Sequence, residues 1–547
     1  MPNRSADTKS PNMVVLTLFE SLDPLRHVLP LTCTGLVIIV ALYLSWHHSP
    51  KPVPNIPIHS YDREEYFRRG YELVQEGQKK YPSCFQLRTA TGWKVLVPIR
   101  FVEELRKNPS LSFARGNDKD AFIEYPGFEA MEAACHDDYF MQEVVRVKLT
   151  QTLNLLYSSV IDESAVAMSE VLREDKTWRT LRIKDDINHI VARVTSRVFL
   201  GSDLCRDQKW LDIVVNHTKA VFMAQKRMRQ TPPALRPLIH YFLPETKLLR
   251  QQLHAARALI SPELAKRRAD VEEALRHGKI PKESADAISW MVEVSQAQGR
   301  KIDVAVHVVS LSMTAIQTTS EVMTNCILQL CETPSVVDDL RAEMISHLKE
   351  GGWTKYTLYK MRFLDSFIRE VMRHHDFLRV TSWRGCTEDV VLSDGTLLPK
   401  GSCIYFDDSK VVDPEHYPDP EKFDPTRSMK KREQPGQEER YAPRSRLDTQ
   451  LTRGTAINSC RYKRTTWLLV TAYMRVLVVS SLIWSSRLKV MLCNFLLKYD
   501  VRLVPGEKRP ADILFEVQRM VPPDVRVQIK VRDVAPEVDL YSPMLST

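Results

Sequence analysis

A single uncharged apolar run near the start of the chain, Val28–Trp46 (VLPLTCTGLVIIVALYLSW), limits the architectures open to everything that follows it. As a helix rising about 1.5 Å per residue, this run spans most of the hydrocarbon layer of a bilayer. Tyr43 and Trp46 lie near one end, where aromatic side chains meet the membrane surface. We therefore expect a leader over residues 1–27, a transmembrane anchor over residues 28–46 and a tethered remainder.

The residues after the apolar run are rich in proline. Pro50, Pro52, Pro54 and Pro57 in SPKPVPNIP favour an extended backbone, so we expect a stiff hinge over residues 47–60. A cleaved signal peptide is the alternative to an anchor. Its apolar core is usually shorter and is followed by small residues, whereas LSWHHSP follows here.

Composition excludes several classes of protein. The 44% hydrophobic and 27% charged residues are typical of a globular chain, and a mean hydropathy of −0.27 argues against a multi-span membrane protein. The net charge is small, 77 − 68 = +9, and the basic residues are scattered, so no nucleic acid partner is indicated. Ten cysteines in 547 residues form no C-x-x-C pair, which favours a reducing compartment over a zinc ribbon or a disulfide scaffold.

The pattern of apolar residues predicts a mainly α-helical fold with small β-sheets. Helical spacing predicts helices over residues 61–80, 138–156, 183–199, 210–226, 246–274, 304–332 and 336–349. Alternation and turn signals predict strands over residues 84–99 and 389–406. The charged segment 427–446 is expected to be a loop, and the chain has no internal repeat and no phosphate-binding glycine loop.

The first feature with chemical content is a run of small and hydroxyl side chains, Thr314–Ser320 (TAIQTTS), inside an apolar helical segment. Hydroxyls in mid-helix compete for backbone carbonyls and lower helix propensity. Such a run can open a groove for a flat ligand or an oxygen species. The alternative is a polar stripe that faces water or another helix.

The second and third features are an acid–base pair and an arginine loop. Glu370 and Arg373 are three residues apart and share a helix face, which alone indicates only a routine ion pair. Phe423–Arg427 (FDPTR) follows a proline-rich acidic stretch, and Arg427 could join the pair, because a guanidinium fits a carboxylate in two-pronged geometry. The alternative for Arg427 is a solvated loop residue.

Together, in this order, these motifs resemble those of the cytochromes P450, in particular the fungal microsomal members. The family pattern is an oxygen-activation helix, then E-x-x-R, then an aromatic-x-x-R loop and a cysteine loop. LSDGTLLPKG and FLLKYDVRL are also similar to fungal members, and the resemblance covers about residues 50–441 and 488–532. It implies a cytochrome P450 fold over residues 61–547.

The resemblance also implies a function and a set of site residues. Thr318 matches the oxygen-activation threonine, and Gln317 stands where the family often has a carboxylate. Glu370, Arg373 and Arg427 would hold the haem-side core together.

Arg146, in VVRVKL, and Arg384, in TSWRG, would bind haem propionates. The implied enzyme is a monooxygenase with haem b that inserts one oxygen atom from O2 into a lipophilic secondary metabolite such as a terpenoid.

The implied partners and location follow from the same resemblance. Electrons would come from NADPH through a membrane-bound reductase. The chain would cross the endoplasmic reticulum membrane once, with its catalytic domain in the cytosol.

The cysteine loop of the family is missing from the printed chain. The loop should read F-G-x-G-x-x-x-C-P-G and supply the thiolate that binds the haem iron. Cys460 lies in TAINSCRYKRTT with no glycine-rich run before it, and Cys493 lies in the C-terminal helix. Neither fits, so the sequence offers no metal ligand.

The missing loop is present in another reading frame. If codons start at the third base of each printed codon, residues 465–487 permit HLAFGHGVHACPGRFFAHLELK, with the cysteine codon across Arg475 and Val476. Few bases can vary in such a shift, so a match of this length is improbable by chance. We infer that residues 442–487 are frameshifted, through a frame error or a misread intron. The competing hypothesis is a catalytically dead, haem-free, membrane-tethered relic or binding protein.

Overall fold

The computed structural model describes residues 51–105, 108–136, 140–149, 152–278, 286–407, 417–435, 486–533 and 537–540, with residues 32, 35, 36, 39, 40, 43 and 414 singly. The predicted leader, most of the predicted anchor and nearly all of the frameshifted segment therefore lie outside the described residues. Within the described part of the chain, no helix combines the length and the apolar character needed to cross a bilayer.

Helices make up most of the described chain. They are α3 (Arg63–Lys80), α4 (Val102–Leu105), α5 (Phe113–Ala121), α6 (Glu129–Cys135), α7 (Phe140–Glu143), α8 (Leu153–Leu172), α9 (Ile183–Leu204), α10 (Gln208–Gln230), α11 (Arg236–Ile239), α12 (Pro244–Arg276), α13 (Ala287–Ala297), α14 (Val304–Glu332), α15 (Val337–Gly351), α16 (Lys355–Lys360), α17 (Arg362–His374) and α18 (Arg427–Arg432). A further helix covers residues 486–498.

The strands form four small sheets. The strands are β1 (Ile58–Ser60), β2 (Phe85–Thr89), β3 (Gly92–Val97), β4 (Leu111–Ser112), β5 (Arg179–Leu181), β6 (Val380–Cys386), β7 (Val390–Val391), β8 (Leu397–Leu398), β9 (Cys403–Asp407), β10 (Tyr499–Leu503), β11 (Ile513–Phe515), β12 (Gln518–Met520) and β13 (Val527–Val531). The largest sheet is mixed, in the order β1-β2-β3-β9-β6-β4, and a second has the order β10-β13-β5. Two hairpins, β7–β8 and β11–β12, complete the set.

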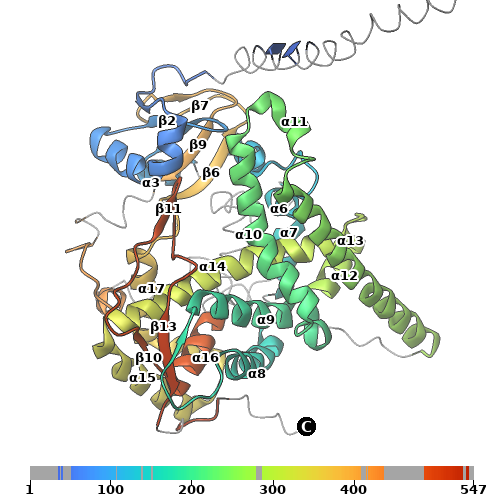
Figure 1. Cartoon of the computed structure of the whole chain (residues 1–547), viewed down its shortest axis with the longest axis vertical. Helices are drawn as coiled ribbons and strands as arrows, with labels where there is room; N and C mark the ends of the chain where they lie inside the picture. Colours follow the sequence, from blue (N-terminus) through green and yellow to red (C-terminus); the bar gives the residue numbers. More distant parts are fainter. Residues whose placement is uncertain are drawn as a thin grey trace, which may run out of the picture.

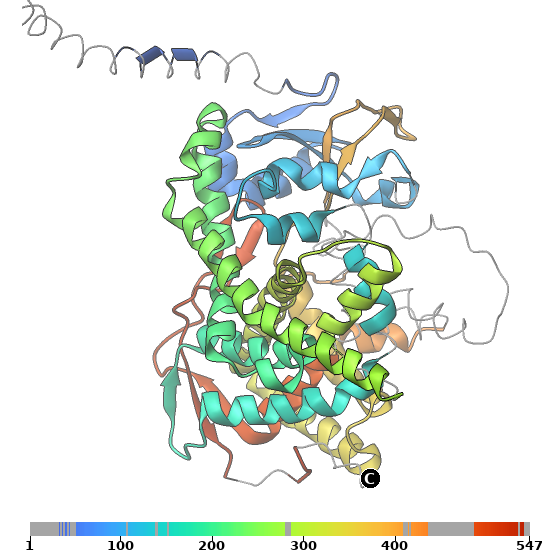
Figure 2. The ribbon, with the colours of Figure 1, turned by 90° about the vertical axis from the view of Figure 1, so that its right-hand side faces the viewer.

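The long helix α14 runs through the middle of the molecule and organises the core (Figure 1). The mixed sheet and α3 lie at one end, and β10, β13 and α15 lie at the other. Figure 2 shows the same division from the side. Asp303 caps α14 by accepting a hydrogen bond from the Val306 amide. The main hydrophobic core joins α14 to α8, α9 and the helix 486–498.

Most of the predicted elements are confirmed. The helix over residues 304–332 has the predicted bounds, and the strand pair over residues 84–99 appears as β2 and β3. The prediction of one helix over residues 138–156 is wrong, because α7, a π-helical turn η2 (Val144–Leu149) and α8 replace it.

The prediction of a loop over residues 427–446 is wrong at its start, where α18 forms. Ion pairs at its two ends, from Arg427 to Glu370 and from Arg432 to Asp365, hold this short helix against α17.

Candidate functional site

The hydroxyl-rich centre of α14 lies near a cavity that is described below. Met313 lines that cavity, and Gln317 follows it by one helical turn on the same face. Gln317 and Thr318 are partly exposed, whereas Thr314 and Thr319 on either side are buried. The Thr318 hydroxyl donates to the Thr314 carbonyl at 3.0 Å. The small side chains thus leave two polar residues accessible on an otherwise buried helix.

Glu370, Arg373 and Arg427 come together in one buried cluster. Arg373 donates to both carboxylate oxygens of Glu370, at 2.8 and 2.9 Å, and Arg427 Nε donates to Glu370 Oε1 at 3.0 Å. The remaining Arg427 nitrogens donate to loop carbonyls, including that of Lys422 at 2.8 Å. This buried geometry differs from a routine surface pair, and the loop before α18 is fastened to α17 through it.

Electrostatics keep the Glu370 carboxylate charged. Burial by itself raises its pKa, but hydrogen bonds from Arg373, the Asp424 amide and Arg427 bring the pKa below the ordinary value. The pKa of Asp365, five residues earlier on α17, is also below its ordinary value. Burial raises its pKa, and Lys489 at 2.8 Å and the nearby arginines lower it overall.

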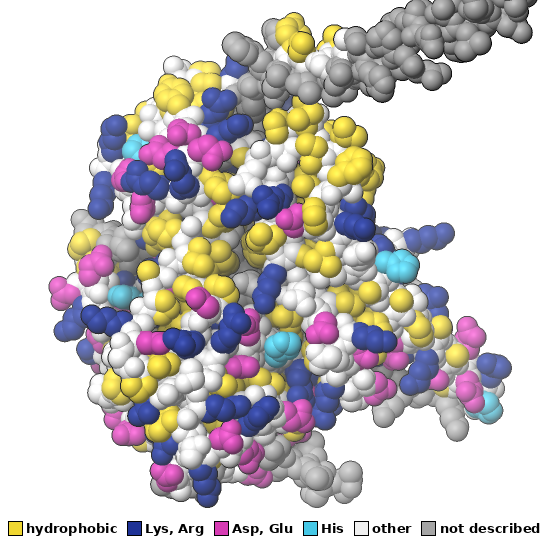
Figure 3. Space-filling view, in the orientation of Figure 1, with side chains coloured by type: hydrophobic (Ala, Val, Ile, Leu, Met, Phe, Trp, Pro, Cys, Tyr) yellow, Lys and Arg dark blue, Asp and Glu magenta, His cyan; other side chains and the backbone are white. Residues whose placement is uncertain are grey.

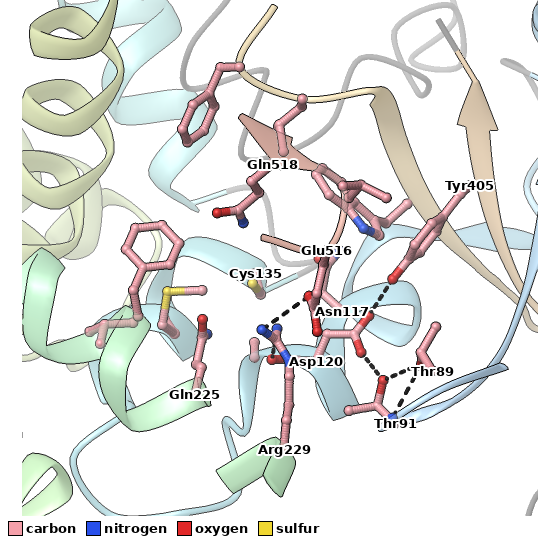
Figure 4. A pocket seen from close by; sticks show the side chains of 18 of the residues that line it. Thr89, Thr91, Asn117, Asp120, Cys135, Gln225, Arg229, Tyr405, Glu516 and Gln518 are labelled. Atoms are coloured by element: carbon pink, nitrogen blue, oxygen red, sulfur yellow. Dashed lines mark hydrogen bonds and ion pairs between the residues drawn. The ribbon is translucent and has the colours of Figure 1, made fainter. Parts of the chain in front are cut away.

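A cavity of about 110 Å³ opens between the mixed sheet, α5, α6, α10, α14 and the β11–β12 hairpin (Figure 4). One wall is apolar, with Phe113, Val221, Met313, Phe377 and Leu378 among its side chains. The arrangement can hold a compact lipophilic molecule against α14.

The other wall of the cavity carries buried charges. Asp120 accepts from Lys94 Nζ at 2.7 Å, from the Tyr405 hydroxyl at 2.8 Å and from Thr91. Arg229 Nη1 lies 3.3 Å from Glu516 Oε2, in the turn of the β11–β12 hairpin. Burial raises the pKa of Asp120, yet the neighbouring cations, chiefly Lys94, lower it overall. Burial raises the pKa of Glu516, and Arg229 only partly offsets this effect.

The hairpin that carries Glu516 packs directly on α3. A Cβ atom at Gly70 would lie 2.8 Å from the Glu516 carbonyl carbon, so only glycine allows this approach. Sequence reasoning missed this polar wall. Its charged members come from β3, α5, α10 and the hairpin, and no local motif links them.

The two predicted propionate ligands have different surroundings. Arg384, on β6, is fully buried, with its guanidinium 5.5 Å from the Phe113 ring centroid and a 2.6 Å hydrogen bond to the Trp383 carbonyl. Phe113 and Trp383 both line the cavity, so Arg384 contacts two residues of its lining. Arg146 lies on η2, and its side chain is outside the described residues.

The fold and motifs are those of a known family. A family model described as Cytochrome P450 matches residues 52–445. The chain belongs to the cytochrome P450 family.

Among curated proteins, the chain is 85% identical over 535 residues to the cytochrome P450 monooxygenase bsc11 of Alternaria brassicicola, covering 98% of this chain and 100% of that protein. It is 34% identical to bsc2 of the same fungus, covering 91% and 93%. A solved structure, retinoic acid bound cyanobacterial CYP120A1, has a TM-score of 0.58 at 14% identity, covering 88% of this chain and 100% of that one. That similarity concerns the fold alone.

Membership of the family makes the chain a monooxygenase by resemblance and implies a haem cofactor, electrons from a redox partner and a lipophilic substrate. Among the cysteines that the structure describes, none fits the axial position of haem. Burial raises the pKa of each described cysteine for which a shift is resolved, namely Cys205, Cys326, Cys331, Cys386, Cys403 and Cys493, which keeps these groups as thiols. Cys135 lines the cavity but lies on α6, outside any glycine-rich loop.

Arg487, at the end of the segment predicted to be frameshifted, is a buried cation in unfavourable surroundings. Its guanidinium is buried and donates only to the hydroxyls of Thr195, at 2.9 Å, and Thr319, at 3.3 Å. Its Nε has no partner, and no carboxylate pairs with it among the described residues. Burial lowers its pKa to about 10.

Proposed function

We propose that the intact gene encodes a haem-thiolate monooxygenase that inserts one oxygen atom from O2 into a lipophilic secondary metabolite such as a terpenoid. Electrons come from NADPH through a membrane-bound reductase. The apolar wall of the cavity supports a lipophilic substrate. The partial exposure of Gln317 and Thr318, on the helix that supplies the lining residue Met313, supports their role in oxygen activation. Glu370, Arg373 and Arg427 hold the core, and Arg384 and Arg146 bind propionates.

The proposed location is the endoplasmic reticulum membrane, with residues 28–46 as a single anchor and the catalytic domain in the cytosol. The surface offers one supporting feature. Leu238, Tyr241 and Phe242 are 59%, 57% and 78% exposed around α11. α11 lies at the same end of the molecule as the first described residues after the predicted anchor (Figure 1), where apolar side chains gather on the surface (Figure 3).

The observation that carries the proposal is where the family match stops. It ends at residue 445, within a few residues of the point where the reading frame is inferred to change. The similarity to bsc11 nevertheless covers 98% of this chain and all of the relative over 535 residues. The segment 442–487 therefore replaces a stretch of similar length, which favours a frame error over an inserted intron.

The end of the frameshifted segment also has a simple explanation at the DNA level. In the shifted frame, the Glu-Leu-Lys that ends the hidden string is read from Trp484–Arg487 and can have the codons GAG, CTC and AAG. In the printed frame, the next residues, Leu488 and Lys489, can also be encoded by CTC and AAG. With AGG for Arg487 and the G that begins every valine codon at Val490, the bases CTCAAGG occur twice in tandem. Removal of one copy restores Glu-Leu-Lys-Val, with a glutamate directly before the leucine.

The second candidate function is a haem-free, membrane-tethered binding protein. The observation that favours it is the lack of a fitting thiolate donor in the printed chain, while the cavity and the buried charge clusters are complete without one. Under this hypothesis the printed sequence is the translated one.

Sequencing of genomic DNA and spliced transcript across residues 442–487 tests the proposal. We expect an in-frame Ala-Cys-Pro-Gly and a single copy of CTCAAGG in both the DNA and the message; an in-frame Ala-Cys-Pro-Gly in the message alone identifies a misread intron. Two copies of CTCAAGG with Ala-Cys-Pro-Gly out of frame in the message mean that the printed string is translated, which supports the haem-free relic. Bases that cannot yield Cys-Pro-Gly in any frame contradict the proposal.

A spectroscopic experiment tests the same point in the protein. The chain with the restored loop should show a thiolate-type Soret band when reduced and bound to carbon monoxide, and the printed chain should not. A restored chain with serine in place of the loop cysteine is the matched control. A thiolate-type band from the printed chain would contradict the loss of the ligand.

A further inference from the structure

We propose that the cavity recognises an uncharged oxygen function, a hydroxyl or a carbonyl, on its lipophilic ligand through the side-chain amides of Gln225 and Gln518. This inference rests on the proposed function, because it takes the cavity to be the place where the substrate binds. It goes further by naming the chemical group that is recognised and the two residues that determine specificity.

The two amides belong to the cavity wall. Gln225, on α10, is only 5% exposed and lines the cavity. Gln518, on β12, has a buried Oε1 without a partner. Both side chains point into the cavity (Figure 4). A buried amide without a hydrogen bond is unfavourable, so a ligand that supplies the missing partner gains affinity.

The two residues come from elements far apart in the sequence, on either side of the cavity. The main chain of Gln518 is bridged to Leu378, so the hairpin position is held by the segment that leads into β6. Val221 lies one helical turn before Gln225 and belongs to the apolar lining of the cavity. A ligand can therefore contact the apolar wall and both amides at once.

The charges of the polar wall explain why the recognised group is neutral. Lys94 pairs with Asp120, and Arg229 pairs with Glu516, so two cations face two carboxylates. Arg229 Nη2 also donates to the Asp120 carbonyl at 3.2 Å. A ligand carboxylate would add a third buried negative charge, which such a balanced cluster disfavours. A hydroxyl can instead donate to one amide oxygen and accept from the other amide nitrogen.

The experiment is a binding titration by calorimetry with three probes on one carbon skeleton: geraniol, its hydrocarbon analogue 2,6-dimethylocta-2,6-diene, and geranic acid. Both the full printed chain and the full chain with the restored loop are used. We expect geraniol to bind about 10-fold more tightly than the hydrocarbon, which is roughly the effect of one or two hydrogen bonds, and more tightly than the acid.

Variants at the two amides locate the effect. Q225L and Q518L should each weaken geraniol binding about 3- to 10-fold and leave hydrocarbon binding unchanged. Q230L, at an exposed glutamine on the same helix, is the matched control and should change neither. Circular dichroism confirms that each variant is folded.

The outcomes separate this inference from the proposed function. Equal affinities for geraniol and the hydrocarbon, no binding of either probe by the unaltered chains, or unchanged geraniol binding by Q225L and Q518L would overturn the inference. Tighter binding of geranic acid would overturn the preference for a neutral group. A restored chain without a thiolate-type band, but with the alcohol preference intact, would instead refute the haem-thiolate function and keep the recognition site.

Discussion

Lys489 and Arg487 lie two residues apart on the helix 486–498, and their surroundings are opposite. Lys489 pairs with Asp365 at 2.8 Å and donates to the Leu358 carbonyl at 2.8 Å. Arg487 is equally buried, but among the described residues it contacts only two threonine hydroxyls. Buried charges are normally paired, because an unpaired one loses its hydration without compensation. The paired residue follows the segment for which we propose a frameshift, and the residue without a carboxylate partner among the described residues ends that segment.

The same contrast holds between larger regions. The clusters of α17 and α18 around Glu370 and Asp365 are held by several arginines and a lysine, and each carboxylate is charged and satisfied. These clusters lie in the part of the chain that matches the family, or just after the frameshifted segment. Within the described residues, the complete ion-pair networks thus lie outside the proposed frameshifted segment, and Arg487, which has no carboxylate partner there, lies at its end.

The largest expected effect comes from breaking the network at Glu370. E370Q leaves two buried guanidinium groups without their carboxylate, so we expect a loss of about 3–5 kcal/mol in the free energy of unfolding. Urea unfolding measures this change. E350Q, which removes an exposed partner of Lys360, is the control and should have no measurable effect. A change below about 1 kcal/mol for E370Q would mean that the cluster does not hold the loop to α17.

An intermediate effect should come from the two cations compared above. R487M removes an unpaired buried charge, so we expect the free energy of unfolding to rise by about 1–3 kcal/mol. K489M removes a paired charge and leaves Asp365 with fewer cations, so we expect a fall of similar size. Urea unfolding of both variants in the printed chain is the test. If both substitutions changed the free energy of unfolding in the same direction, the proposed distinction between the two residues would be wrong.

The smallest effect is a dependence of stability on pH. The pKa values of Glu370 and Asp365 are lower in the folded chain than their ordinary values of 4.5 and 3.8. The stability that these groups contribute is therefore fully present above those values and is lost as the pH falls through the lower, folded-state pKa values. Unfolding midpoints measured between pH 6 and pH 3 should fall less steeply for E370Q than for the unaltered chain. Parallel curves would contradict the shifted pKa of Glu370.

Local patterns in the sequence predicted much of the fold. The helix 304–332 was predicted from its apolar spacing, and its start follows a capping aspartate. The strand pair β2–β3 was predicted from alternation around Gly92, which has a positive φ. The order of Thr318, Glu370, Arg373 and Arg427 was enough to recognise the family, because each motif is short and local. The break between α7 and α8 and the turn α18 depend on packing and ion pairs with distant residues, so local patterns could not predict them.

The sequence by itself determined the family and the helix that borders the cavity, since both depend on residues that are neighbours in the chain. Only the tertiary structure decided that Arg427 is a buried partner rather than a solvated loop residue. It alone placed Gln225 and Gln518 around one cavity and Lys94 beside Asp120. The physical reason is that these contacts join elements far apart in the sequence. Such contacts arise from packing the whole core, and no local spacing records them.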